Sequence, residues 1–291
     1  MNERRTGGVL AYAGEAGSFA EEAARSIGPR GPEPVGLPGF REVFTAVSAD
    51  VVAAGVLPIE NLLGGTVRET YDLLLEFDLA VVGEVVVPVR LCLAALPGQR
   101  LEAIERVYSH VQALAQAERF LRTRPWTLLT TYNTAAAARM VAERAERGSA
   151  AVVAPRAAER YGLEVLAGGI EDAPDDRTRF LVVAQPGGWT PAVRAGPGST
   201  GRATPTRTTL VMGLANEPGS LVRALRVLAD GGLNMSKLES RPLPGRAWQY
   251  VFWIDLDADA GEPGVAATLD RLREAASFVR VLGSYPRAAS A

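Results

Sequence analysis

A segment rich in glycine, proline, serine and threonine separates the chain into two parts. Residues 187–205 read GGWTPAVRAGPGSTGRATP and have no apolar periodicity, which is typical of a linker. The chain has 291 residues, and a domain usually takes about 100–200. We therefore predict one domain at residues 1–186 and a second at residues 206–291.

Expected strands and helices alternate along the first domain. Strands are predicted at residues 7–13, 51–57, 79–87, 104–108, 127–131, 150–154 and 163–166, and residues 58–66 are predicted to form a loop. Such alternation indicates an α/β domain with parallel strands. Because the last crossing returns to a strand that begins at Phe180, we expect two lobes with a cleft between them.

The second domain shows the order strand, helix, strand, strand, helix, strand. Its strands are expected at residues 207–214, 233–243, 247–256 and 279–285. This βαββαβ order is that of a ferredoxin-like unit. One face of its sheet would be open, so we expect this domain to pair with a second copy in a dimer.

Charge and rare residues exclude several functions. The net charge of -2 provides no basic surface for nucleic acid or an anionic membrane, and no apolar run approaches the roughly 20 residues that span a bilayer. The N-terminus lacks a secretory signal, so we expect a cytoplasmic protein. Cys92, His110 and Lys237 are each the only residue of their kind, so we expect chemistry without a metal or another cofactor.

Residues 171–183 read EDAPDDRTRFLVV and deliver a hydroxyl and a guanidinium to the start of a strand. Because side chains alternate along a strand, Thr178 and Phe180 should face one side and Arg179 the other. Strand ends often hold binding groups on a rigid frame. An edge strand entered through a solvated turn is the alternative interpretation.

Three hydroxyl residues stand where a predicted strand gives way to a helix. They are Ser18, Thr66 and Thr134. The N-terminus of a helix leaves N–H groups unpaired and attracts carboxylate or phosphate. Several such ends around one cleft, with Arg179 nearby, would suit a small dianion. Each residue could instead be only a helix cap.

Several motifs, in a shared order, resemble those of bacterial prephenate dehydratases with a C-terminal ACT domain. They are YAGEAGSF at 12–19, GVLPIEN at 55–61, SHVQALAQ at 109–116, TRF at 178–180, NEPGSL at 216–221 and ESRP at 239–242. The resemblance implies a two-lobed catalytic domain like a periplasmic binding protein, followed by the ferredoxin-like ACT domain that senses phenylalanine.

The same resemblance implies an activity and a set of site residues. Prephenate would lose carbon dioxide and its ring hydroxyl to give phenylpyruvate in phenylalanine biosynthesis, with Thr178 assisting the departure of the hydroxyl. Asn61, Ser109 and Gln116 occupy substrate-site positions, and Arg179 would pair with a substrate carboxylate. Ser18, Thr134 and Glu60 complete the expected substrate site, with Glu60 either a general acid or a residue that positions its loop. His110 would more simply make a structural hydrogen bond than transfer a proton.

Regulation is also implied by the resemblance. L-phenylalanine would bind between two subunits of a homodimer or homotetramer and inhibit the enzyme. The expected contact residues are Asn216, Pro218, Gly219, Ser220, Leu221, Glu239, Ser240 and Arg241.

The chain departs from the family pattern at four positions near the presumed site. They are Leu62, Val111, Asn133 and Asp176. These changes leave three alternatives open: arogenate as substrate in place of prephenate, a decarboxylase variant that avoids aromatisation, and a non-catalytic amino-acid sensor.

Overall fold

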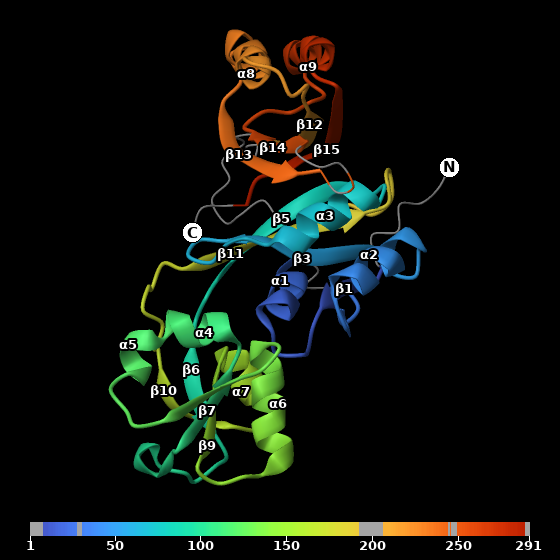
Figure 1. The fold of residues 1–291 in the computed structure, drawn as a ribbon. Helices are drawn as coiled ribbons and strands as arrows, with labels where there is room; N and C mark the ends of the chain where they lie inside the picture. The colour runs from blue at the N-terminus through green and yellow to red at the C-terminus, as the bar shows by residue number, and fades with distance from the viewer. Residues whose placement is uncertain (1–7, 28–30, 192–205, 244, 246–248, 289–291) are drawn as a thin grey trace, which may run out of the picture.

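The computed structural model describes residues 8–27, 31–191, 206–243, 245 and 249–288. Three sheets follow one another in space (Figure 1), two in the first domain and one in the ferredoxin-like domain. Residues 192–205 of the predicted linker lie outside the described residues. Trp189, also assigned to the linker, is buried against Leu10 and Val182 of the first lobe, so the domain extends beyond residue 186.

The first lobe is built on the sheet β2-β1-β3-β11-β5. Its strands are β1 (Leu10–Ala13), β2 (Val35–Leu37), β3 (Ala54–Asn61), β5 (Ala80–Pro88) and β11 (Arg177–Ala184), with the short β4 (Gly65–Thr66) paired to β3. Its helices are α1 (Phe19–Ile27), α2 (Phe40–Ser48) and α3 (Arg68–Glu76). Strands β1, β2 and β3 are parallel as predicted, but β11 lies antiparallel between β3 and β5 because the chain re-enters this lobe from the second one.

The second lobe contains the sheet β10-β6-β9-β7-β8. Its strands are β6 (Cys92–Ala95), β7 (Arg106–Ser109), β8 (Thr127–Thr130), β9 (Ser149–Val153) and β10 (Glu164–Gly168). Its helices are α4 (Val111–Gln116), α5 (Glu118–Leu121), α6 (Thr134–Arg144) and α7 (Pro155–Arg160), with a 3-10 turn at Leu101–Ala103. The chain crosses between the lobes twice, from β5 to β6 and from β10 to β11, which confirms the two-lobed α/β prediction.

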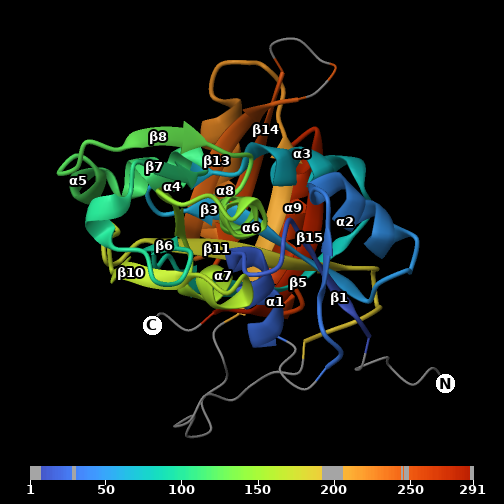
Figure 2. The ribbon, with the colours of Figure 1, turned by 90° about the horizontal axis from the view of Figure 1, so that it is seen from below.

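The lobes meet where α1 approaches α6 and α7 (Figure 2). Gly17 has a φ of +87°, and a Cβ there would come within 2.7 Å of the Cα of Ala157, so only glycine permits this contact. Beside it, Nε of Arg139 in α6 donates to Oε2 of Glu15 at 2.6 Å. These contacts hold the two lobes together on one side of the cleft.

The ferredoxin-like domain follows the predicted βαββαβ order. It consists of β12 (Thr206–Gly213), α8 (Ser220–Asp230), β13 (Met235–Pro242), β14 (Tyr250–Leu256), α9 (Pro263–Ala275) and β15 (Phe278–Pro286). The antiparallel sheet has the order β13-β14-β12-β15, and α8 and α9 cover its face away from the lobes (Figure 1).

The other face of this sheet packs on the first lobe of the same chain. Trp253 and Tyr285 are fully buried in a core shared with Phe44, Tyr71 and Leu181. A Cβ at Gly283 would come within 1.9 Å of the carbonyl oxygen of Val81, which shows how closely β15 and β5 approach. The expectation that this face is open for a partner subunit was therefore wrong, because the first lobe covers it.

Strand β3 is longer than predicted, and its extension matters for the site. Residues 58–61 were expected in a loop, but β3 continues through Pro58 to Asn61. A register shift opposite Phe180 of β11 accommodates the proline, since proline enters a sheet mainly at bulges and edges. Asn61 therefore lies on a strand, directly opposite Thr178.

Candidate active site

Strands β3 and β11 present different side chains to their two sides. Thr178 pairs with Asn61, and Arg179 pairs with Glu60. Because neighbours on a strand face opposite sides, Thr178 and Asn61 face the cleft between the lobes, while Arg179 and Glu60 face the ferredoxin-like domain. One pair of strands thus joins the cleft to the domain boundary.

The cleft between the lobes is a cavity of about 410 Å³. The residues that line it come from both lobes and lie far apart in the sequence. They are Phe19, Phe40, Pro58, Asn61, Gly64, Gly65, Thr66, Val67, Val89, His110, Gln112, Ala113, Gln116, Thr134 and Thr178. Among these described residues none is an arginine or a lysine, so any positive potential for an anionic ligand must come from another source.

Several helices begin at this cleft. Phe19, Phe40 and Thr134 are the first residues of α1, α2 and α6, and Val67 is the N-cap of α3. Each of these ends presents backbone N–H groups and the positive end of a helix dipole. The predicted gathering of helix N-termini around one cleft is therefore present, and its members include two ends that begin with phenylalanine.

Asn61 is the centre of the hydrogen bonds in the cleft. Its Nδ2 lies 3.1 Å from Oγ1 of Thr178, and its Oδ1 accepts from the backbone N–H of Gly64 at 2.5 Å. The Nε2 atoms of Gln112 and Gln116 lie 3.4 and 3.5 Å from the same Oδ1. Because Asn61 donates to the oxygen of Thr178, the hydroxyl hydrogen of Thr178 remains available to a ligand.

Asp176 fixes this direction of donation. Its carboxylate is 1% exposed and accepts from Nδ2 of Asn61 at 3.0 and 3.1 Å and from Nε2 of Gln116 at 2.7 Å. An ionised carboxylate only accepts hydrogen bonds, so both amides must turn their N–H groups toward it. No basic side chain in the described part of the chain forms an ion pair with Asp176.

The structure brings together only some of the predicted substrate residues. Thr178, Asn61, Gln116 and Thr134 all line the cleft. Ser18 instead caps α1, where its Oγ accepts from the N–H of Glu21 at 3.3 Å.

Ser109 points away from the cleft. It is fully buried, and its hydroxyl donates to the carbonyl of Val152 at 2.6 Å. The interpretation of Ser18 and Ser109 as substrate contacts is therefore corrected, because neither residue lines the cleft.

Two further residues of the 109–116 motif belong to the cleft. Gln112 lies four positions before Gln116 on α4, so the two share a helix face, and both amides reach Asn61. His110 lines the cleft, and its Nδ1 accepts from the N–H of Gln112 at 3.3 Å as the N-cap of α4. Asp176 was noted only as a departure from a family pattern, and its contacts could not be foreseen from spacing.

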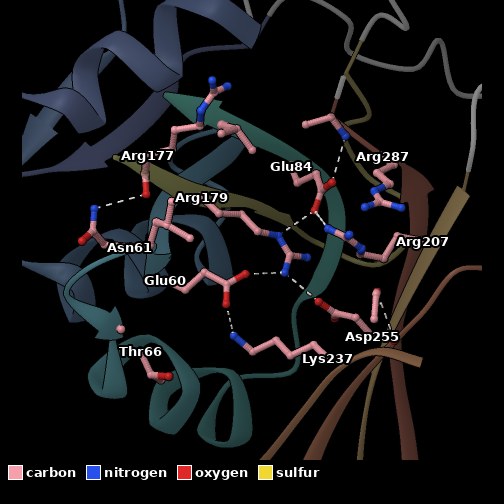
Figure 3. A pocket seen from close by; sticks show the side chains of 15 residues that line it. Glu60, Asn61, Thr66, Glu84, Arg177, Arg179, Arg207, Lys237, Asp255 and Arg287 are labelled. Carbon is pink, nitrogen blue, oxygen red and sulfur yellow. Dashed lines mark hydrogen bonds and ion pairs between the residues drawn. The ribbon is translucent and has the colours of Figure 1, made fainter. Parts of the chain in front are cut away.

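Arg179 and Glu60 lie on the other side of the strands, where they line a second cavity (Figure 3). The guanidinium of Arg179 is bonded to Glu60 at 2.9 Å, Asp255 at 2.6 Å and Glu84 at 2.7 Å. The hydroxyl of Tyr285 accepts a further bond at 3.1 Å. The expectation that Arg179 pairs with a substrate carboxylate is corrected, because three carboxylates of the protein already surround it.

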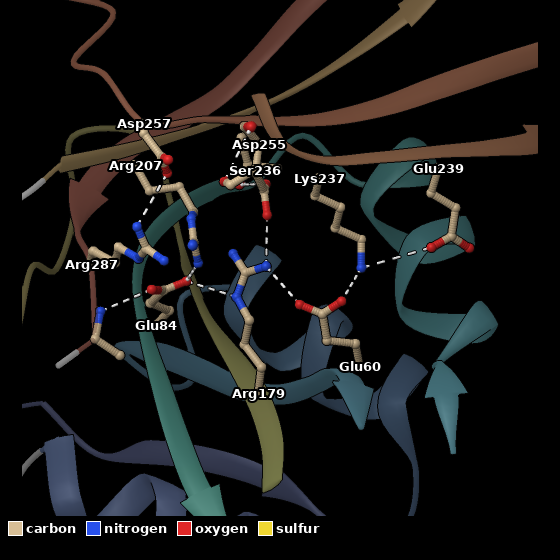
Figure 4. A network of polar contacts seen from close by, with 12 residues as sticks. Glu60, Glu84, Arg179, Arg207, Ser236, Lys237, Glu239, Asp255, Asp257 and Arg287 are labelled. Carbon is tan, nitrogen blue, oxygen red and sulfur yellow. Dashed lines mark hydrogen bonds and ion pairs between the residues drawn. The ribbon is translucent and has the colours of Figure 1, made fainter. Parts of the chain in front are cut away.

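These contacts join the first lobe to the ferredoxin-like domain (Figure 4). Lys237 of β13 pairs with Glu60, and Arg207 of β12 pairs with Glu84 at 2.6 Å. Burial by itself would raise the pKa of Glu60, but the hydrogen bonds from Lys237 and Arg179 outweigh it and lower that pKa. Glu60 is therefore a charged structural partner in this network and not a proton donor in the cleft.

The predicted regulatory residues divide into two groups. Asn216, Pro218 and Gly219 lie in the turn that enters α8, where Gly219 has a φ of +80°, and Ser220 and Leu221 are the first residues of that helix. On β13, Glu239 accepts from the hydroxyl of Thr66 at 2.6 Å, and Arg241 pairs with Asp72 at 3.0 Å. These two side chains face the first lobe of their own chain, and Ser240 between them is exposed.

A comparison with known families identifies the fold of the catalytic part. The family model described as prephenate dehydratase matches residues 10–187. The chain belongs to the prephenate dehydratase family. Arogenate dehydratase 2 of Petunia hybrida is 38% identical over 291 residues, which cover 95% of this chain and 71% of that protein.

Solved structures extend the similarity to the second domain. The prephenate dehydratase of Arthrobacter aurescens in complex with L-Phe matches with a TM-score of 0.85 and 32% identity, over 96% of this chain and 90% of that one. A protein described as a novel type of quorum quenching acylase, GqqA, matches with a TM-score of 0.84 and 32% identity, over 96% and 98% of the two chains. The family resemblance seen in the sequence is confirmed.

Proposed function

We propose that this protein is a carbon–oxygen lyase that converts prephenate to phenylpyruvate in phenylalanine biosynthesis. The main support for this proposal is the hydrogen bonding in the cleft of this chain, which belongs to the family. Thr178 is hydrogen bonded to Asn61, and Asn61 is hydrogen bonded to Gln112 and Gln116. In the part of the chain that the structure describes, no helix is long and apolar enough to cross a bilayer. We propose a cytoplasmic location.

The reaction depends more on orienting the substrate than on a strong acid. As the ring carboxylate leaves as carbon dioxide, its bonding electrons enter the ring, the ring becomes aromatic, and the carbon–oxygen bond to the hydroxyl breaks. Negative charge grows on that oxygen. Thr178 donates its hydroxyl hydrogen there, and Asn61 supports the oxygen of Thr178 from behind.

Among the described residues that line the cleft there is no arginine or lysine, so neutral hydrogen-bond donors must bind the two carboxylates of the substrate. N–H groups at the starts of α1, α2, α3 and α6 surround the cleft, and such groups bind carboxylates. The amides of Gln112 and Gln116 supply further polar atoms. Phe19, Phe40 and Val67 provide an apolar wall for the ring and exclude water from it.

The activity is tested by mixing the purified protein with prephenate and following phenylpyruvate by its absorbance. Steady formation of phenylpyruvate is expected. A protein that binds prephenate but releases no phenylpyruvate would support the sensor alternative, and a product that has lost carbon dioxide without becoming aromatic would support the decarboxylase alternative.

A second candidate substrate is arogenate, which carries an ammonium group where prephenate has a keto oxygen. The unpaired carboxylate of Asp176 beside a cleft without arginine or lysine favours it. Arogenate has one negative charge fewer than prephenate, so it is repelled less by Asp176. The relative from Petunia hybrida is named an arogenate dehydratase.

Replacing Asp176 with asparagine should shift the preference toward prephenate. Charges roughly 10 Å apart interact by about 1–2 kcal/mol at an effective dielectric constant near 20, so the ratio of kcat/KM for prephenate to that for arogenate should rise about tenfold. Asp175→Asn is the matched control, because Asp175 is exposed. An unchanged ratio in Asp176→Asn would remove Asp176 as a determinant of substrate choice.

We further propose that L-phenylalanine inhibits the enzyme by binding the second domain at a contact between subunits of a homodimer or homotetramer. The Arthrobacter aurescens relative, solved with L-Phe, supports this. The exposed residues 216–219 of the α8 turn and the exposed Ser240 are the parts of the predicted site that remain open to such a ligand, whereas Ser220 is buried. Glu239 and Arg241 would have to leave Thr66 and Asp72 to join it.

Gly219→Ala should weaken inhibition by phenylalanine severalfold and leave kcat unchanged. Gly219 has a φ of +80° at the N-cap of α8, and alanine is strained there, so the turn must change shape. Gly232→Ala is the control, since Gly232 has a φ of +69° beyond the other end of α8. Dose–response curves for both variants give the comparison, and equal inhibition would refute a role for the turn.

A further inference from the structure

The cavity behind the active-site strands has the features of a second ligand site. Its volume is about 620 Å³, and it lies between the first lobe and the ferredoxin-like domain (Figure 3). Residues of β3, β5, β11, β12, β13 and β14 form its walls, and Arg287 and Ala288 close one side. The activity proposed above makes no use of this cavity.

The lining carries more positive than negative charge. Arg177, Arg179, Arg207, Lys237 and Arg287 are basic, whereas Glu60, Glu84 and Asp255 are the acidic residues. Arg179 and Lys237 are neutralised by these carboxylates. Arg207 also pairs with Glu84, so the surplus of two positive charges over the lining belongs to Arg177 and Arg287, and Arg287 pairs in turn with Asp257 outside the lining.

Arg207 and Arg177 have donors without a partner. Arg207 is 8% exposed and donates a hydrogen bond from Nη1 to Glu84, but its buried Nε makes no hydrogen bond. The guanidinium of Arg177 forms no ion pair within the described residues, and Arg287 reaches Asp257 only at 3.5 Å. A buried donor left without an acceptor is unfavourable, so an anion that supplies one is expected to bind.

The shape and the apolar part of the lining restrict the ligand further. Leu62 and Val86 line the cavity, and both are more exposed than most large hydrophobic residues. A carboxylate matches the guanidinium groups, and an apolar body would cover these two side chains. The positive surplus disfavours an additional ammonium group.

We propose that this cavity binds an aromatic α-keto acid, which is a small carboxylate with an apolar body and no ammonium group. That this class includes the product of the reaction rests on the proposed function, whereas the preference for an anion rests only on the charges of the cavity.

A ligand in this cavity would act on the active site through a shared wall. Asn61, Gly65 and Thr66 line both the cavity and the cleft. The carbonyl of Arg177 accepts from the N–H of Leu62 at 2.9 Å and from Nδ2 of Asn61 at 3.2 Å. An anion that draws Arg177 toward the cavity therefore changes the support of Asn61 and of the adjacent Thr178.

Binding is tested with phenylpyruvate and the full-length protein, by calorimetric titration and by a crystal structure of the complex. The carboxylate should lie beside Arg207 and Arg177. Arg207→Met should weaken binding at this site tenfold or more, because hydrogen bonds to charged groups are the strong ones. Arg226→Met is the matched control, since Arg226 is exposed on α8. Arg177→Met, which removes a half-buried side chain, gives the same test if Arg207→Met fails to fold.

Phenylpyruvate found only in the cleft, or bound with equal affinity by the Arg207→Met and Arg226→Met variants, would overturn the proposal. L-phenylalanine is the second ligand, and equal occupation of the cavity by it would overturn the exclusion of an ammonium group. A protein that turns over prephenate but does not bind phenylpyruvate here loses only this inference. A protein that binds it here but makes none loses only the proposed function.

Discussion

Replacing Thr178 with valine should lower kcat for prephenate by about 10²–10⁴-fold, the usual contribution of a positioned proton donor, with little change in KM. Valine has nearly the same shape but cannot donate to the departing hydroxyl. The oxygen of Thr178 accepts from Asn61, so its own hydrogen is the one directed at the substrate. Initial rates of phenylpyruvate formation over a range of prephenate concentrations separate kcat from KM.

Serine at the same position is the informative control. Thr178→Ser retains the hydroxyl and should keep most of the activity, although the smaller side chain holds its rotamer less firmly. Thermal unfolding of both variants checks that the pairing of β11 with β3 and β5 survives. A Thr178→Val protein that is folded and retains kcat within about twofold would remove the hydroxyl from the reaction, because even a modest catalytic donor is worth more than that.

Local patterns predicted the elements well. Residues 79–87 were predicted as a strand and form β5 at Ala80–Pro88, because β-branched residues dominate this run. Alternation along the strand at Thr178 correctly placed Thr178 and Arg179 on opposite sides. Because of this alternation, Thr178 and Arg179 cannot both face the same cleft. The family resemblance nevertheless favoured a substrate role for Arg179, and the geometry of the strand was the better guide.

The partners of buried polar groups could not be predicted. Arg179 meets Glu84 and Asp255, which are 95 and 76 positions away in the sequence. No periodicity indicates such pairs. Ser109 likewise appeared to end a strand at the site, but its hydroxyl turns to β9, the strand beside it in the sheet. The open face of the ferredoxin-like sheet was misassigned for the same reason, since only the packed structure shows that the first lobe covers it.

Replacing Arg179 with methionine should destabilise the protein by about 3–5 kcal/mol, the usual cost of removing one partner from a buried ion pair. Methionine preserves much of the volume but leaves Glu84 and Asp255 buried beside each other without the charge that holds them together. Because these carboxylates belong to different domains, the boundary between the domains should loosen first. Chemical unfolding followed by circular dichroism gives the free energy, and Arg41→Met, which removes one partner of the exposed Arg41–Glu76 pair, should cost no more than about 1 kcal/mol.

The double variant Arg179→Met/Glu84→Gln distinguishes lost charge from lost packing. If uncompensated charge causes the loss, neutralising Glu84 should restore part of the stability, whereas a packing defect would persist.

The dependence of stability on pH gives a second measure of the role of Arg179. The pKa of Glu60 lies below its ordinary value of 4.5, so its contribution is present above about pH 4.5 and is lost as the pH falls through the lowered pKa. Without Arg179, Glu60 keeps only Lys237 as a partner, and acid unfolding should begin at a higher pH. An acid transition unchanged from that of the wild type would show that Arg179 does not stabilise the ionised form of Glu60.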